Sequence, residues 1–239
     1  MSKRPLIVEP SILSGDFGRL ADEAKRVEES GADAIHVDIM DGNFVPNLSL
    51  GPKAVAAINR ATPLFLDVHL MIYNPYDYIE RFVEAGADRL TIHFEATEAV
   101  EESLAYIRKC NIEAGLAFCP ETSESMIPKY LDKCDLILVM TVAPGFGGQA
   151  FMHDMLEKVR FVRELCDDLH IYHRGVVQKD SAKAADLLPF NIQVDGGVDQ
   201  KTGALCVEAG ANVLVSGTHL FKAPQMKKAV EEMRRLGRS

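Results

Sequence analysis

Residues 34–42, with the sequence AIHVDIMDG, place an imidazole, a carboxylate and a thioether at alternate positions. The β-branched residues between them predict a strand, on which successive side chains point to opposite faces. His36, Asp38 and Met40 therefore share one face. A strand buried on both faces is typically a nearly continuous aliphatic run, and this stretch departs from that pattern. For either polar residue alone, a partly buried strand with satisfied polar groups is the simpler interpretation.

Residues 64–71, with the sequence LFLDVHLM, repeat the arrangement and place His69 on the equivalent face. A further carboxylate, Asp195, ends the strand-like segment 191–195. Two imidazoles and two carboxylates form a donor set suited to Zn²⁺, Fe²⁺, Mn²⁺ or Co²⁺ rather than to Ca²⁺ or Mg²⁺. If the carboxyl ends of these strands meet at one rim, we expect one divalent metal ion held by four residues: His36, Asp38, His69 and Asp195.

Three methionines, Met40, Met71 and Met140, end strand-like segments on the same side as these polar residues. Methionine is more often a core residue, but three thioethers beside a metal would form an apolar pocket lining that excludes water. His93 also ends a strand-like segment and has no evident partner in the sequence. We interpret it as a core histidine or as one that lies behind the metal ligands.

Three glycine-rich turns follow the later strand-like segments. Glycine lets the backbone approach a ligand closely, and several N–H groups can then point at one anion. Ordinary turn chemistry explains any one of these turns, whereas three neighbouring turns favour a phosphate cradle. No Walker-type GK[ST] motif is present, so a nucleoside triphosphate is not indicated. The residues of the three turns are Gly145, Phe146, Gly147, Gly148, Gly196, Gly197, Ser216 and Gly217.

Strand-like and helix-like segments alternate along the whole chain. Eight strands are expected at 6–10, 34–40, 64–71, 89–94, 113–119, 136–142, 191–195 and 213–216. Helical spacing of apolar residues is found at 16–30, 74–85, 98–110, 152–166, 200–209 and 224–235. Three glycines that end a helix and precede a strand mark a repeated joint: Gly31, Gly86 and Gly210.

Alternating elements of this kind predict parallel pairing, and eight such units close into a (β/α)₈ TIM barrel. We expect residues 1–239 to form a single domain, with a longer-than-usual connection at about 167–190. Within that connection, residues 180–188 suggest a short helix. A doubly wound open sheet is the alternative. It has little support, because no GxGxxG motif opens the first helix and the polar residues cluster at strand ends.

The composition excludes several classes of protein. Of 239 residues, 47% are hydrophobic and 26% are charged, and no apolar run approaches the roughly 18 residues of a membrane span. The net charge of −9 argues against non-specific nucleic-acid binding. The five cysteines are scattered, without a CxxC pair, as is typical of reduced thiols in the cytoplasm. We expect a cytoplasmic protein without membrane attachment, and a homo-oligomer whose copy number the sequence does not indicate.

The chain resembles the ribulose-phosphate 3-epimerase family in five motifs that together span nearly its whole length. They are PSILS at 10–14, HVDIMDG at 36–42, DVHLM at 67–71, MTV with PGFGGQ within 140–149, and VDGGV at 194–198. The resemblance implies a divalent metal on the four residues above, with Asp38 and Asp195 as the two acid–base residues. It also implies that Ser11 contacts the substrate, that His69 lies against it, and that the glycine turns hold its phosphate.

The resemblance implies interconversion of D-ribulose 5-phosphate and D-xylulose 5-phosphate, a step of the pentose phosphate pathway, through a metal-stabilised enediolate. Inverting a carbon next to a ketone requires a proton to leave one face and another to arrive on the opposite face, which two carboxylates can do. An epimerase for allulose 6-phosphate and an inactive sugar-phosphate-binding barrel are the alternatives. A lyase or decarboxylase on a related barrel would need a strand-end lysine, and none is evident.

Three positions depart from the family pattern. Ala143 stands where the family usually has asparagine, which is expected to loosen the turn before the glycines. The segment SGTH at 216–219 replaces the usual Gly-Ser-Ala, and the connection at 167–189 is longer than in typical relatives. None of the three removes an expected catalytic group.

Overall fold

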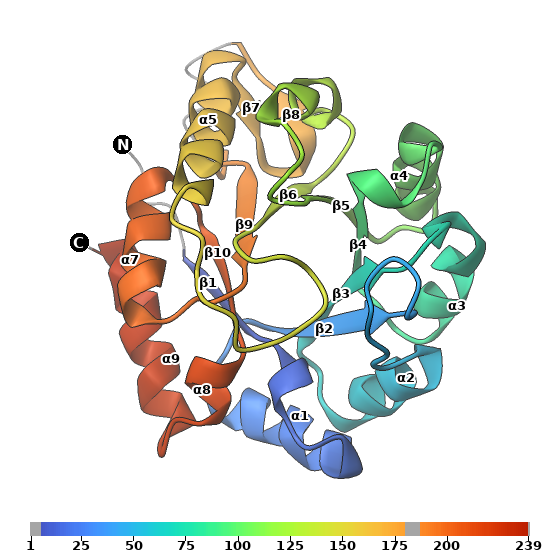
Figure 1. Cartoon of the computed structure of the whole chain (residues 1–239), viewed down its shortest axis with the longest axis vertical. Coiled ribbons are helices and arrows are strands. Elements are labelled where there is room, and N and C mark those ends of the chain that lie inside the picture. The colour runs from blue at the N-terminus through green and yellow to red at the C-terminus, as the bar shows by residue number, and fades with distance from the viewer. Residues whose placement is uncertain (1–5, 180–186, 239) are drawn as a thin grey trace.

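The computed structural model describes residues 6–179 and 187–238, whose strands curl around a common axis (Figure 1). Seven parallel pairings join eight strands in the order β1-β10-β9-β6-β5-β4-β3-β2. A parallel bridge between Ser11 and His36 brings the two ends of this series together. The predicted (β/α)₈ barrel is therefore confirmed. The strands are β1 (Ile7–Pro10), β2 (Ala34–Met40), β3 (Phe65–Met71), β4 (Arg89–His93), β5 (Glu113–Phe118), β6 (Leu136–Met140), β9 (Asn191–Asp195) and β10 (Val213–Ser216).

The helices form an outer ring around the strands (Figure 1). Their inner faces carry apolar residues at helical spacing, as in the last helix, where Met226, Ala229, Val230 and Met233 are buried. This amphipathic spacing is why these segments form helices that cover the barrel. The helices are α1 (Leu20–Glu29), α2 (Pro52–Ala61), α3 (Ile79–Glu84), α4 (Val100–Lys109), α5 (Met155–Asp168), α7 (Gln200–Ala209), α8 (Thr218–Phe221) and α9 (Met226–Arg235).

The repeated joint between helix and strand is confirmed. Gly31, Gly86 and Gly210 all have positive φ angles. Gly210, with φ 114°, ends α7 in the left-handed conformation, and a Cβ there would lie 2.6 Å from the side chain of Arg163. A larger residue would meet both backbone strain and a clash, which explains the glycine.

Several elements differ from the sequence expectation. Helix α2 was not expected, although proline at its first turn and buried Val55 and Ile58 on its inner face account for it. Two of the expected helices, at 16–30 and 74–85, begin with short 3₁₀ turns at Phe17–Arg19 and Pro75–Tyr78. Between β5 and β6, the chain forms 3₁₀ turns at Glu124–Met126 and Pro128–Tyr130 instead of an α-helix.

The long connection at about 167–190, which follows α5, contains a small antiparallel pair, β7 (Ile171–Tyr172) and β8 (Val176–Val177). Gly175 lies in the turn between them with φ 66°, and a Cβ there would lie 2.9 Å from the carbonyl oxygens of Leu131 and Cys134. The turn is thus packed directly against the chain before β6. Most of the short helix expected at 180–188 lies outside the described residues. In the described ranges, no helix combines the length and the apolar character that crossing a membrane requires.

Candidate active site

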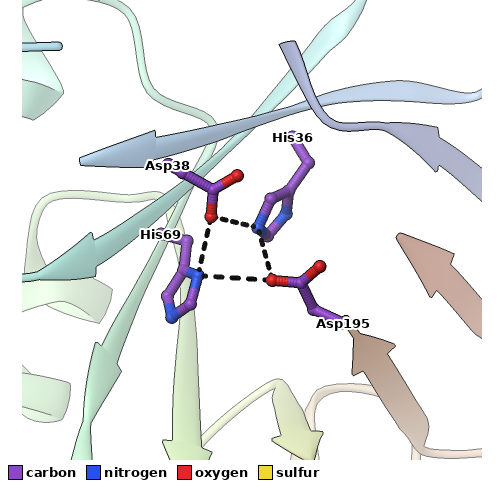
Figure 2. A group of neighbouring side chains, drawn as sticks. All are labelled: His36, Asp38, His69 and Asp195. Atoms are coloured by element: carbon purple, nitrogen blue, oxygen red, sulfur yellow. Dashed lines mark hydrogen bonds and ion pairs between the residues drawn. The ribbon is translucent and has the colours of Figure 1, made fainter. Parts of the chain in front are cut away.

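Four side chains from three strands converge at the carboxyl-terminal mouth of the barrel (Figure 2). Asp38 Oδ1 lies 3.3 Å from His36 Nε2 and 3.1 Å from His69 Nδ1. Asp195 Oδ2 lies 4.0 Å from each of the same two nitrogens. Tetrahedral zinc with bonds of about 2.0–2.1 Å has its ligand atoms about 3.3 Å apart. The described side chains therefore bring the four predicted ligands to spacings close to those of a metal site.

Strand pairing explains why these residues meet. In the parallel register of β2 with β3, Asp38 is opposite His69, so the side chains of neighbouring strands face one another. All seven residues of β2 are buried. His36 and Asp38 point inward because successive side chains of the strand alternate between the helices and the barrel axis. Asp195, the last residue of β9, reaches the same point from across the mouth (Figure 2).

His36 is held in place from the interior of the barrel. Its Nδ1 lies 2.9 Å from Asp67 Oδ2, and the same oxygen accepts a hydrogen bond of 2.7 Å from Gln193 Nε2. Its Nε2 is buried and has no hydrogen-bond partner. A buried polar atom without a partner is costly, so a group that accepts the lone pair of this nitrogen fits the site. A carboxylate behind an imidazole that faces a cluster of donors is the usual arrangement around a metal ligand.

His69 is also held from behind. Its Nδ1 faces Asp38, and its Nε2 lies 2.9 Å from Nε2 of His93. His93 is completely buried, and its Nδ1 lies 3.2 Å from Glu95 Oε2. The expectation that His93 has no partner is wrong, because β3 and β4 are neighbours and place the two imidazoles in one row. Its interpretation as a buried histidine behind the ligands agrees with the structure.

The two carboxylates differ sharply in proton affinity. Burial and the negative charge of Asp38 raise the pKa of Asp195 from 3.8 to about 7. Burial would also raise the pKa of Asp38, but the positive charge of His36 and the close contacts of its carboxylate with His36 and His69 outweigh burial and hold that pKa well below its usual range. Burial lowers the pKa of His36, yet Asp38 and Asp67 raise it well above 6.5. The cluster is thus rich in negative charge and favours a cation.

A cavity of about 360 Å³ opens above this cluster. Asp38 and Asp195 form part of its floor, together with the nearly buried side chains of the three predicted methionines, Met40, Met71 and Met140. Seven of the eight residues of the predicted glycine turns line the same cavity: Gly145, Phe146, Gly147, Gly148, Gly196, Gly197 and Gly217. The polar floor and the glycine rim therefore belong to one pocket.

The turn after β6 lies across the barrel mouth in Figure 1. Gln149 Nε2 donates to the carbonyl oxygens of Ala143 at 2.7 Å and Phe146 at 2.9 Å, and Asn47 Nδ2 donates to Gly145 O at 2.8 Å. These bonds tie the turn to itself and to the segment after β2. They act on backbone carbonyls, so alanine at position 143 does not remove them.

Three further residues that were predicted to bind substrate lie at different places relative to the cavity. Ser11 lines the cavity, and its hydroxyl donates to Asp38 Oδ2 at 2.6 Å. The hydroxyl of Ser216 instead donates to Val198 O at 2.6 Å, and this buried residue is not part of the lining. His69 is fully buried and also does not line the cavity, so its place is below the pocket floor.

Five further polar residues line the pocket and were not predicted as site residues, namely Ser14, Gln149, Asp199, Thr218 and His219. Ser14 and Gln149 lie within quoted family motifs, Thr218 and His219 within the segment 216–219, and Asp199 directly follows the VDGGV motif, so proximity in the sequence could have indicated them. Among the described residues that line the cavity, none is a lysine or an arginine. An anion at the glycine end would therefore be bound mainly by backbone N–H groups and hydroxyls.

The fold and the site define a class: (β/α)₈ barrels with a cluster of potential metal ligands in the mouth and glycine turns at its rim. Within this class, the chain belongs to the ribulose-phosphate 3 epimerase family, whose model matches residues 7–221. It is 48% identical over 222 residues to ribulose-phosphate 3-epimerase of Chlamydia muridarum (strain MoPn / Nigg), covering 93% of this chain and 91% of that protein. It is 44% identical to the Bacillus subtilis (strain 168) protein of the same name, covering 95% and 97%.

Two solved structures with the same fold are more distant in sequence. A 3-keto-L-gulonate-6-phosphate decarboxylase from Vibrio cholerae aligns with a TM-score of 0.67 and 15% identity, over 98% of both chains. A mutant tryptophan synthase α-subunit from Pyrococcus furiosus aligns with a TM-score of 0.66 and 14% identity, over 99% of this chain and 98% of the other. At this level of identity, the alignments establish the shared barrel alone.

Proposed function

We propose that this protein interconverts D-ribulose 5-phosphate and D-xylulose 5-phosphate by moving a proton at C3. The single observation that carries the proposal is the placement of two carboxylates, Asp38 and Asp195, at the floor of one pocket. Asp38 comes from β2 and Asp195 from β9. One carboxylate oxygen of each lies within 4.8 Å of the other and of one ring nitrogen from each of the two histidines, His36 and His69. A flat enediolate between Asp38 and Asp195 would have one carboxylate on each face.

The opposed proton affinities of the two residues in the metal-free protein support the roles that the family resemblance implies. Asp38, whose pKa is held low, is the carboxylate that removes the C3 proton. Asp195, whose pKa is raised to about 7, holds a proton that it can deliver to the other face. Two titratable groups with pKa values pushed apart by their surroundings are the usual basis for an acid and a base in one site. In the reverse reaction, the two residues exchange roles.

Ser11 and the pocket lining support this chemistry. The Ser11 hydroxyl donates to Asp38 Oδ2, which leaves the other oxygen of Asp38 toward the histidines and fixes the orientation of the carboxylate. The methionine lining is nearly closed to water, with exposed fractions of 4% for Met40 and 2% for Met71 and Met140. An apolar lining protects a charged intermediate from stray protonation.

We propose that His36, Asp38, His69 and Asp195 hold one divalent metal ion, either Zn²⁺, Fe²⁺, Mn²⁺ or Co²⁺. The unpartnered Nε2 of His36 and the mixed nitrogen and oxygen donor set both fit such an ion. When bound, the ion supplies Lewis-acid stabilisation for the negative charge that develops on the substrate oxygens. The backbone N–H groups of the turns at Gly145–Gly148, Gly196–Gly197 and Gly217 would bind the phosphate. We also propose a cytoplasmic location, since all five cysteines are free.

The test is turnover of D-ribulose 5-phosphate against allulose 6-phosphate by the pure, metal-loaded protein. We expect a preference of at least about tenfold in kcat/KM for the pentulose, a modest value for a difference of one carbon unit. A double Asp38→Asn and Asp195→Asn variant is the control for contaminating enzymes. Turnover of the hexulose alone would assign the site to the longer ketose. Absence of turnover with both substrates would indicate a binding protein.

A further inference from the structure

We propose that Glu95, acting through His93, fixes the tautomer of His69 and so presents His69 Nδ1 to the metal. The inference rests on the metal site proposed above and extends it to two positioning residues. Three side chains form a row behind the site: His69 Nε2 lies 2.9 Å from His93 Nε2, and His93 Nδ1 lies 3.2 Å from Glu95 Oε2. Both imidazoles are completely buried, so water cannot replace either contact.

Glu95 is a fixed hydrogen-bond acceptor at the outer end of this row. Its Oε1 accepts a hydrogen bond of 2.8 Å from the backbone N–H of Cys119 and another from the hydroxyl of Thr122. Burial would raise the pKa of Glu95, but hydrogen bonds from His93, Thr122 and Cys119 outweigh it and lower that pKa to about 2. An ionised carboxylate has no proton to donate.

Lys158 holds the segment that surrounds Glu95. Its ammonium donates to the carbonyl oxygens of Cys119 at 2.9 Å, Pro120 at 3.0 Å and Thr122 at 2.7 Å. This side chain is only 4% exposed and comes from α5. Three charge-assisted bonds to one short segment fix its backbone, and with it the N–H and hydroxyl that orient Glu95.

The order of protons along the row follows from these contacts. A neutral imidazole carries one proton, on one of its two nitrogens. His93 Nδ1 lies 3.2 Å from Glu95 Oε2 and 3.5 Å from Cys119 Sγ. The ionised carboxylate is the stronger partner and only accepts, so His93 carries its proton on Nδ1 and offers the lone pair of Nε2. His69 then donates its own proton from Nε2 to His93, which leaves the lone pair of Nδ1 for a metal ion that would lie between it and the oxygens of Asp38 and Asp195. This is the tautomer that a metal ligand at Nδ1 requires.

The same order of protons excludes a second metal site. His93, Glu95 and Cys119 also have ligand atoms within 4.8 Å of one another, a spacing compatible with a metal ion. His93 Nδ1 already carries a proton in the proposed arrangement, so it has no lone pair to offer. Burial and the charge of Glu95 also raise the pKa of the Cys119 thiol well above its usual value, which disfavours the thiolate. The cluster of His93, Glu95 and Cys119 should therefore hold no metal ion.

The first test is ¹⁵N NMR of histidine-labelled, zinc-loaded wild-type protein, which needs no substitution. The inference predicts a protonated Nε2 on His69 and a protonated Nδ1 on His93, with one zinc ion per chain by direct metal analysis. A protonated Nε2 on His93, or a second zinc ion on that residue, would overturn it. Absence of zinc binding by the wild-type protein would overturn both this inference and the metal site itself.

The second test is the Glu95→Gln substitution, which keeps the size of the side chain and reverses one hydrogen bond. The Gln oxygen must stay with the N–H of Cys119, so its amide NH₂ faces His93 Nδ1 and forces that nitrogen to accept. The proton of His69 then moves to Nδ1, where it competes with the metal. We expect zinc affinity to fall about 10- to 100-fold, with the ¹⁵N signals of both histidines showing the reversed tautomers.

Glu98→Gln is the matched control, since it makes the same change at an exposed glutamate three residues further along the chain and outside the row. Its zinc affinity should stay within about twofold of wild type. Zinc affinity unchanged in Glu95→Gln, or lost equally in both variants, would overturn the inference while leaving the epimerase proposal intact. Because the readout is zinc binding without substrate, failure of the epimerase proposal would be seen separately in the turnover assay.

Discussion

Asp38 and Asp195 carry the same carboxylate, and their neighbours give the two residues different chemistry. Asp38 is next to two imidazoles and a serine hydroxyl, all of which favour its charged form. Asp195 is bounded by backbone and by the charge of Asp38, and nothing of comparable strength offsets its burial. Residue type alone thus does not assign the base and the acid. The contacts of each residue do.

The first prediction concerns Asp195 in the metal-free protein. A group whose pKa is raised on folding contributes stability that is present below its unfolded pKa, here 3.8, and lost as the pH rises through about 7. The Asp195→Asn variant has no such loss. We expect the two metal-free proteins to be similar near pH 4 to 5, and the variant to be more stable at pH 8 by on the order of 2 kcal/mol.

Urea unfolding of both proteins at the two pH values measures this difference. Asp168→Asn, a change at an exposed aspartate of α5, is the control and should show no pH-dependent gain. If the variant is less stable than wild type at pH 8, ionisation of the buried Asp195 carboxylate does not destabilise the folded protein. That result would contradict the prediction.

The second prediction separates the two acid–base residues. In an Asp195→Asn variant that retains metal, Asp38 can still remove and return a proton on its own face. D-ribulose 5-phosphate, assigned to Asp38 by the family resemblance, should then exchange its C3 hydrogen with deuterated solvent without epimerising. Asp38→Asn should exchange the opposite epimer only, and net epimerisation should fall by at least about 10²-fold in both variants. NMR of the C3 hydrogen measures exchange, and metal analysis shows that each variant is loaded. Near wild-type epimerisation by either variant would mean that one base suffices.

At the scale of elements, parallel strands made much of the site predictable. The alternation in β2 and β3 indicated which residues share the inner face. The rule that parallel strands gather their carboxyl ends then placed the four proposed ligands at one rim. The bounds of β2, β9 and β10 agree with the predicted ones. The repeated glycine joint was visible because left-handed backbone needs a particular residue type.

The sequence does not specify which residues of neighbouring strands lie opposite one another or how far apart their side chains are. His93 was interpreted without a partner because its contact with His69 depends on the β3–β4 register, in which His69 is opposite Thr91. The row of two imidazoles and Glu95 could be found only after that register was known. Helix α2 was missed although its apolar residues have helical spacing, with Val55 and Ile58 buried on one face.

The third prediction concerns the turn after β6. A Cβ at Gly147 would meet no atom within 4 Å, and its φ is not in the left-handed region. Gly147→Ala should therefore fold normally, and any effect should arise from the bound phosphate. We expect KM for the sugar phosphate to rise about tenfold with little change in metal content, since one backbone N–H contact loses its close approach.

Gly51→Ala is the matched control for that substitution. Gly51 also has open space around its missing Cβ and an unexceptional φ, but it precedes α2 and does not line the cavity. Its KM should equal that of wild type. An equal KM for Gly147→Ala and wild type would remove this turn from the proposed phosphate site.

At the scale of the whole molecule, a chain of net charge −9 gathers buried charge at the barrel axis. Below the four proposed ligands, Arg89 Nη1 lies 3.5 Å from Glu9 and 3.6 Å from Asp67. Its Nη2 also lies 2.8 Å from Glu113 Oε2, so one guanidinium faces three carboxylates, in addition to the two in the proposed metal site. A divalent ion in the mouth would offset part of this negative charge, which links metal binding to the stability of the barrel.

The fourth prediction follows from that link. A ligand that binds only the folded state adds about 2.7 kcal/mol to stability at 100 times its dissociation constant. We expect saturating Zn²⁺ to raise the free energy of unfolding by about that amount and a chelator to remove the gain along with activity. Ca²⁺, which prefers an all-oxygen site, is the control and should stabilise little. Equal unfolding curves with and without Zn²⁺ would contradict the proposed site.

The homo-oligomer expected from the sequence stays a prediction that sedimentation analysis would test.

The central claim, proton transfer at C3 by two residues on opposite faces, is tested most directly by following D-ribulose 5-phosphate in D₂O with the wild-type, metal-loaded protein. Proton NMR at early times reports the hydrogen on C3 of both epimers. Because Asp38 removes the original proton and Asp195 delivers one that comes from solvent, the D-xylulose 5-phosphate formed should carry deuterium at C3. The unreacted substrate should still carry hydrogen. Product that retains the original hydrogen, or no product at all, would contradict the account.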